Sequence, residues 1–196
     1  MARIFPGLAI FGLLAISQAM AALLVRDRSR AVRWRLQAAP VPGWSVACGS
    51  LMYLTVGLTA LLVLIYIAGF ALFHLELRNI PTLLALGIGF TLCLAALQLL
   101  IGFWARSERG AQAISAGCVM LLALFGGAFV PVADYPGPWR ILALGLPTGA
   151  AQMGMGLVLA GPSGVWPGLQ ILTLWIWALV LSAAAVAIYR RPLVKS

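Results

Sequence analysis

The chain of 196 residues is 63% hydrophobic and only 9% charged, and it carries a formal net charge of +9. A water-soluble domain has about 25% charged residues, so this composition excludes a water-facing globule and indicates an integral membrane protein. The positive charge does not indicate nucleic-acid binding, because the arginines adjoin apolar runs and form no basic face interleaved with polar surface.

Five apolar runs reach the length of about 20 residues that a membrane-spanning helix needs. In chain order they are residues 4–25, 46–73, 82–104, 112–130 and 169–189. Each run is expected to be helical, because a bilayer offers no hydrogen-bond partners to irregular backbone. The sequence therefore predicts an all-α, polytopic membrane helix bundle in which residues 1–196 form a single transmembrane domain.

The basic residues predict the orientation of these spans. Ten of the thirteen Lys and Arg residues fall in three short stretches, residues 26–35, 106–109 and 190–195. Loops rich in Lys and Arg stay on the cytoplasmic side of a membrane. With all three stretches inside, five spans place the amino terminus outside and the carboxyl terminus in the cytoplasm, and we expect the plasma (inner) membrane as the location.

The first apolar run also allows a second interpretation. Arg3, the apolar core and the small residues at 19–21 fit a signal peptide with a cleavage site. Cleavage there would leave the five arginines of residues 26–35 on the translocated side, against the charge rule. An uncleaved span is therefore favoured.

Residues 26–39 are expected to form a cytoplasmic helix that lies along the membrane surface. Leu36 falls on the apolar stripe of this helix. Arg28 and Arg35 flank the stripe on one side and Arg33 flanks it on the other, an arrangement that suits contact with lipid phosphates. The residues alone leave open whether this helix is a charged anchor or docks onto a cytoplasmic partner.

A tight inner turn joins the third and fourth spans. Ser107 is placed to cap the fourth helix, and Glu108 follows in its first turn, where the helix dipole favours an acid. Arg106 and Arg109 complete the turn. A solvated turn and a contact with a partner both fit this segment.

The outer connection, residues 131–165, is rich in proline and yet apolar. Pro131, Pro136 and Pro147 are among its prolines. We expect two short helices that dip into the outer leaflet and return, because non-helical turns at that depth survive only when they pack against protein or line a cavity. A plain sixth span over residues 147–165 is the alternative, but it would place the basic carboxyl tail outside.

The spans lack groups for chemistry. The single histidine, His74, falls in a short outer loop, and none of the four acids lies mid-span. An enzyme that uses Ser163 is disfavoured, because no span carries a histidine to activate that hydroxyl. Glutamines at membrane depth are expected to join helices by hydrogen bonds; they are Gln18, Gln98, Gln152 and Gln170. These features fit a transporter powered from outside the membrane and equally a non-transporting scaffold.

Four segments in order resemble type-2 ATP-binding-cassette permeases. Phe5-Pro6-Gly7 resembles the opening of the family's second span, and the inner turn at residues 102–112 resembles the turn before its fifth span. The pair Asp27-Arg28 and residues 35–41 resemble the stretch after the second span. The family's glycine-rich exit and outer re-entrant turn are matched by residues 126–131, Tyr135-Pro136, Trp139 and Leu146-Pro147.

The resemblance implies the membrane half of an ATP-driven exporter of an amphipathic small molecule, drug or lipid-like substrate. Two permease copies would face each other, and cytoplasmic ATPase subunits would clamp beneath them. ATP and Mg would bind those subunits, because this chain has no phosphate-binding loop and so is expected to carry neither cofactor nor catalysis. Contacts with the ATPase are implied for Asp27, Arg28, Arg33, Arg35, Leu36, Arg106 and Glu108. An outer gate is implied for Gly126, Gly127, Phe129, Pro131, Pro136, Trp139 and Pro147.

Two departures from the family pattern stand out. The family's first span has no counterpart ahead of residue 4, so we expect that span to be missing here or supplied elsewhere. Arg30-Ala31-Val32 replaces the Gly-Thr that usually follows the acid-Arg pair, which weakens the transfer of contacts to individual arginines.

Overall fold

The computed structural model describes residues 4–29, 43–73, 79–160 and 166–190. Within these ranges lie seven α-helices and one 3-10 turn. The long helices are α1 (Phe5–Ser29), α3 (Gly43–Phe73), α4 (Ile80–Trp104), α5 (Glu108–Phe125) and α8 (Gly168–Arg190). The short elements are η1 (Val132–Asp134), α6 (Gly137–Gly145) and α7 (Pro147–Ala160). The expected all-α helix bundle is confirmed.

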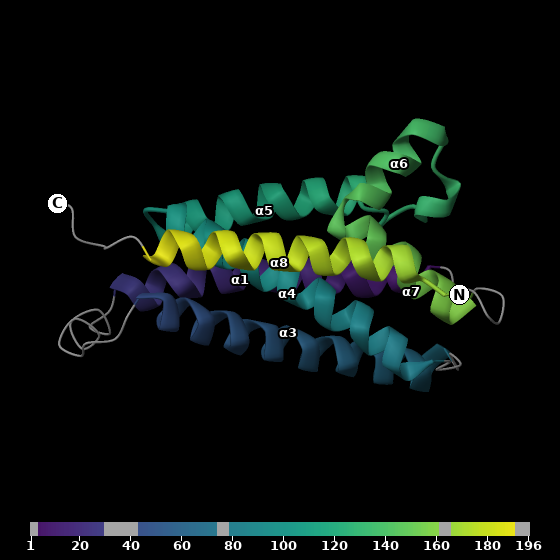
Figure 1. Ribbon diagram of the computed structural model, residues 1–196, viewed down its shortest axis with the longest axis horizontal. Helices are drawn as coiled ribbons and strands as arrows, with labels where there is room; N and C mark the ends of the chain where they lie inside the picture. Colours follow the sequence, from purple (N-terminus) through teal and green to yellow (C-terminus); the bar gives the residue numbers. More distant parts are fainter. Residues whose placement is uncertain (1–3, 30–42, 74–78, 161–165, 191–196) are drawn as a thin grey trace.

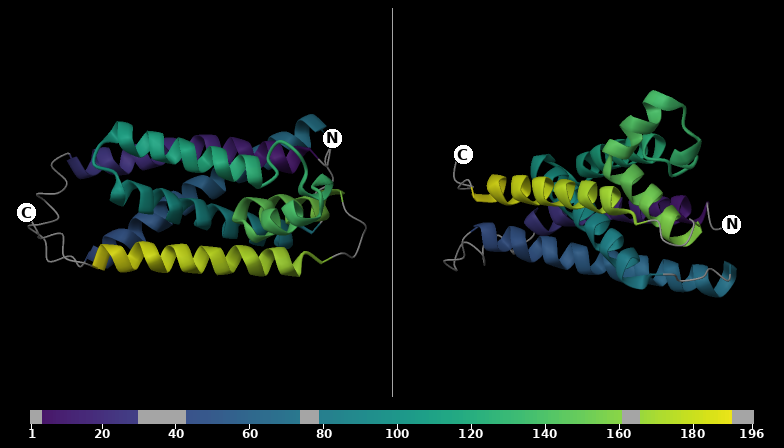
Figure 2. Two further views of the ribbon diagram at one scale, coloured as in Figure 1. Left: turned by 90° about the horizontal axis from the view of Figure 1, so that it is seen from above. Right: turned by 45° about the vertical axis from the view of Figure 1, so that its right-hand side comes forward.

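The five long helices run side by side along one axis, with α4 at the centre (Figures 1 and 2). In α4, 67% of the span is buried inside the protein, against at most 33% in α1, α3 and α8. Leu86, Phe90 and Leu94 of α4 are buried in the main apolar cluster. Helix α4 therefore has a partner on almost every side, while its neighbours keep broad apolar faces for lipid.

Four helices are long and apolar enough to cross a membrane: α1, α3, α4 and α8. They coincide with four of the five expected spans. Helix α5 occupies the place of the remaining one but is 18 residues long, and Glu108, Arg109 and Gln112 stand in its first turns. It ends at Phe125, earlier than the expected boundary at residue 130, because Gly127 turns the backbone away with a φ of +79°.

Helix α1 is longer than expected. No proline lies between Pro6 and Pro40, and the helix continues through Asp27 and Arg28 to Ser29. The start of the expected surface helix, residues 26–29, therefore belongs to the spanning helix. The rest of that element, residues 30–39, lies outside the described residues, as do Arg33, Arg35 and Leu36.

The segment between α5 and α8 folds as a helical hairpin. The axes of α6 and α7 differ by 100°. Helix α5 ends and α8 begins at the same end of the bundle (Figure 1), so this segment returns to the end at which it started. Helix α7 has only 14 residues, too few to cross a bilayer alone. This geometry agrees with the expected re-entrant hairpin.

Candidate functional site

The described basic residues gather at one end of the bundle, with one exception. Arg26 lies in the last turns of α1, Arg106 and Arg109 flank the start of α5, and α8 ends at Arg190. These positions share the end at the left of Figure 1, which we term the basic end. The exception is Arg140 in α6, at the opposite end. Each of the three basic stretches thus has described residues at this end, which is the arrangement that the predicted topology requires.

The turn between α4 and α5 presents its charges to solvent. The Ser107 hydroxyl accepts a 3.1 Å hydrogen bond from the amide of Gly110, so the predicted cap of α5 is confirmed. Glu108 lies in the first turn of α5. Arg106, Glu108 and Arg109 are all exposed. The cap holds this turn in one conformation and leaves its charged side chains available to a partner.

The opposite end carries the proline-rich hairpin, which we define as residues 126–160. Gly126 caps the carboxyl end of α5, and an added Cβ there would collide with the side chain of Thr148. The side chain of Thr148 occupies this space and donates a 3.0 Å hydrogen bond to the carbonyl of Leu122. Pro147 begins α7, the helix that carries Thr148. The close approach of α7 to the end of α5 therefore depends on a glycine at position 126.

Three further hydrogen bonds secure the hairpin. Tyr135 donates to the carbonyl of Leu124, with 2.9 Å between the oxygen atoms. The buried Gln152 side chain accepts a 3.3 Å hydrogen bond from the amide of Val132. The indole N–H of Trp177 in α8 donates to the carbonyl of Gly145 at 2.7 Å. The hairpin is therefore tied to α5 and α8 as well as to itself.

The residues expected at an outer gate all lie in this hairpin. Pro131 precedes η1 and Pro136 precedes α6, each as the capping residue. Trp139 stacks on Phe125, with ring centroids 6.2 Å apart. Phe129 lies beside Phe11 of α1, with centroids 5.2 Å apart. The structure thus brings together most of the residues that the motif singled out, around the end of α5.

Helix α1 connects the two ends of the bundle. A Cβ added to Gly7, in its first turn, would lie 2.6 Å from the carbonyl oxygen of Ala128 in the hairpin. At the other end, Leu24 packs against Gly102 of α4, and Arg26 follows two residues later. Asp27 and Arg28 fall in the last turn of α1, although their side chains are not described. One unbroken helix therefore joins the basic end to the hairpin.

A buried polar network holds α1 in place midway. The Gln98 side chain of α4 donates a 3.1 Å hydrogen bond to Ser17 of α1 and accepts a 2.7 Å bond from Ser115 of α5. The Ser17 hydroxyl in turn donates to the carbonyl of Leu14 at 2.8 Å. Gln98 was expected to join helices, but its two serine partners were not identified from the sequence.

The described part of the chain offers no metal site, since no three His, Cys, Asp or Glu side chains within it lie close enough to hold an ion. Its buried polar side chains are all uncharged, and they are Ser17, Thr82, Thr91, Gln98, Ser115, Thr148 and Gln152. His74 and Ser163, considered above for catalysis, lie outside the described residues. What the geometry offers is an exposed basic end, a hairpin and a helix that joins them.

Comparison with known protein families gives one result. Residues 1–188 match the family model described as "ABC-2 family transporter protein". No curated protein and no solved structure matches the chain.

Proposed function

Because the chain belongs to the ABC-2 transporter family, we propose that it is the membrane permease of an ATP-driven exporter for an amphipathic small molecule, drug or lipid-like substrate. Permeases of this family lack catalytic activity, and a separate ATPase subunit hydrolyses the ATP. The interior supports this cargo class over sugars or ions, because the buried polar groups of the described residues carry no charge.

The basic end is the proposed docking surface for the ATPase. The positive-inside rule favours the cytoplasm for an end that carries Arg26, Arg106 and Arg109. The capped turn at Ser107 offers a rigid and exposed contact. We place the second contact at the carboxyl end of α1, where Asp27 and Arg28 begin the family-like motif. A second permease copy completes the transport path.

The observation that carries the proposal is the continuity of α1. A push on the segment after Arg26 acts on a helix whose other end is in contact with the hairpin at Gly7. ATP binding can bias only those permease states that interact with the ATPase differently. Movement at the basic end must therefore reach the hairpin through a mechanical connection. A packed helix provides that connection, and the uncharged network at Gln98 sets its position relative to α4 and α5.

The test is co-purification of the chain with its ATPase and stimulation of ATP turnover in lipid vesicles. We expect Arg106→Glu to weaken both, because it reverses an exposed charge at the basic end. Arg140→Glu is the matched control, since Arg140 is equally exposed but lies at the opposite end. Membrane insertion of both variants is verified by protease accessibility.

A non-transporting scaffold is the competing function, because a bundle whose described residues bury no charge suits either role. A scaffold would bind the ATPase without changing its turnover. Normal association combined with unchanged ATP turnover and no cargo movement would therefore support the scaffold and contradict the permease.

A further inference from the structure

Helices α1 and α3 are in contact toward the hairpin end of the bundle, and a groove lies between them nearer the basic end. Phe5 packs on Tyr66 with ring centroids 5.8 Å apart, and Gly69 faces the Phe5 ring. Gly12 lies within van der Waals reach of Ile65. Beyond these contacts a groove of about 370 Å³ opens between the two helices.

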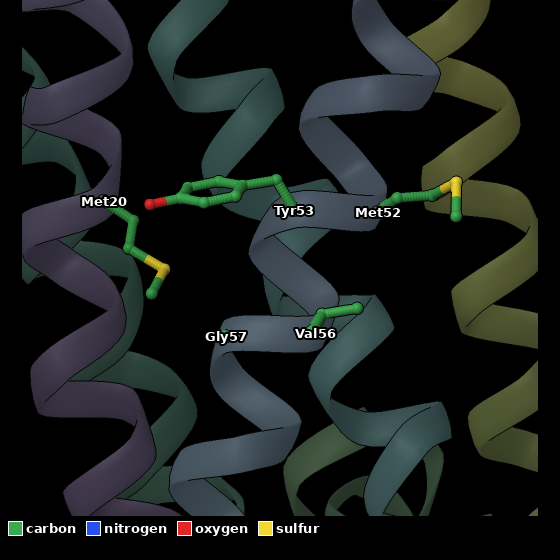
Figure 3. Close-up of a pocket in the computed structure, with 5 residues that line it drawn as sticks. All are labelled: Met20, Met52, Tyr53, Val56 and Gly57. Carbon is green, nitrogen blue, oxygen red and sulfur yellow. The ribbon is translucent and has the colours of Figure 1, made fainter.

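The groove is apolar and faces away from the core. Its lining residues are Met20 of α1 and Met52, Tyr53, Val56 and Gly57 of α3. Figure 3 shows the Tyr53 ring reaching toward α1 and Met20, while Gly57 leaves open space one turn further along α3. The side chain of Tyr53 is 79% exposed and that of Val56 is 66% exposed. The groove therefore opens to the hydrocarbon region and suits a flexible apolar chain.

The basic end supplies a charge at a matching depth. Arg26 is exposed and follows Met20 by six residues, about 9 Å along the α1 axis. Trp44, half exposed, stands at the start of α3, and tryptophans favour the membrane–water interface. A phosphate beside Arg26 would therefore place the start of its acyl chain near the depth of Met20.

From this arrangement we infer a lipid-binding site. An anionic phospholipid from the leaflet at the basic end places its phosphate at Arg26 and one acyl chain in the groove between α1 and α3. The guanidinium group provides several donors in a planar fork that matches phosphate oxygens. A neutral apolar ligand would make no use of Arg26. The inference does not depend on transport, and it holds for a permease or a scaffold alike.

Native mass spectrometry of the full chain, with phosphatidylglycerol and phosphatidylcholine of identical acyl chains, tests the site. We expect wild type to retain phosphatidylglycerol preferentially. Gly57→Leu fills the groove. Displacement of about two methylene groups of the acyl chain from the groove should lower lipid retention roughly tenfold. Gly49→Leu is the control, because Gly49 also faces open space on α3 but does not line the groove.

The charge is tested separately. Arg26→Gln should lower the preference for phosphatidylglycerol about fivefold, as expected for one Arg near an anionic surface, and leave phosphatidylcholine retention unchanged. Arg109→Gln, exposed at the same end on α5, should not change the preference. A photoreactive residue at Tyr53 should label lipid. Equal retention by both glycine variants, equal retention of the two lipids by wild type, or photolabelling of a protein segment in place of lipid would overturn the inference.

Discussion

Gln98 of α4 and Ser115 of α5 are joined by a 2.7 Å hydrogen bond in the middle of the bundle, and both side chains are fully buried. The same Gln98 side chain reaches Ser17 of α1 at 3.1 Å. Apolar packing in a bilayer does not by itself fix which helix faces which, since lipid tails are as apolar as leucine. The side-chain amide of Gln98, which bonds to both serines, therefore specifies that α1, α4 and α5 pack together in this register.

Replacement of Gln98 by leucine should destabilise the bundle. Two interhelical hydrogen bonds are lost, and each contributes about 0.6 kcal/mol on average in membrane proteins, so we expect a loss of about 1 kcal/mol. Reversible unfolding in mixed detergent micelles measures the change. Gln18→Leu is the control, because Gln18 is half-buried and outside the network. Equal stability of the two variants would show that the network does not hold the helices.

The contact between Gly7 and Ala128 should control coupling of the hairpin to α1. Gly7→Ala places a methyl group 2.6 Å from a backbone oxygen, so the hairpin or the helix must shift, at a cost of about 1–3 kcal/mol. Gly12→Ala is the matched control in the same helix, because its methyl group meets only the Ile65 side chain at 3.8 Å. We expect a lower unfolding temperature and weaker permease-stimulated ATP turnover for Gly7→Ala alone. Similar behaviour of the two variants would contradict the role assigned to α1.

Gly127 should be intolerant of substitution for a conformational reason. Its φ of +79° lies in the left-handed region, where an alanine costs about 1–2 kcal/mol, and a Cβ there would also meet the Val132 side chain. Gly127→Ala should therefore loosen the hairpin and accelerate its cleavage in limited proteolysis. Gly145→Ala, at a position with open space around it, should leave the cleavage rate unchanged.

Loss of the Ser107 cap should fray the start of α5. Ser107→Ala removes the acceptor of the Gly110 amide, and such caps contribute about 1 kcal/mol. Amide hydrogen exchange at Gly110 should become faster, while Gln112→Ala, at an exposed position inside the same helix, should not accelerate it. Unchanged exchange at Gly110 in Ser107→Ala would mean that the cap does not order the turn.

The sequence predicted local features well. Four spans, the cap at Ser107 and the helical hairpin between α5 and α8 all appear in the structure. Each depends on short-range properties such as hydropathy, proline content or the preference of serine for a helix start. The boundary at Phe125 was missed because apolar residues continue past the helix end, while the glycine conformation at Gly127 ends it.

Contacts between distant segments were not predictable in this way. Gln98 was recognised as a polar group that needs a partner, but nothing in the local pattern names Ser17, which lies 81 residues away. The proximity of Gly7 to Ala128 likewise depends on the packing of α1 against the hairpin. The groove beside Tyr53 likewise depends on how α1 and α3 pack against each other.

By itself, the sequence determined that this chain crosses a membrane several times, and it placed the arginines where one end of the bundle becomes basic. Those outcomes follow because transfer of each segment between water and lipid is decided by its own side chains. Only the tertiary structure decided that α4 is central and that α1 joins the basic end to the hairpin. It also decided which buried hydroxyl groups form hydrogen bonds with Gln98. Inside a bilayer many helix pairings bury equivalent apolar surface, so close packing and hydrogen-bond geometry make the choice.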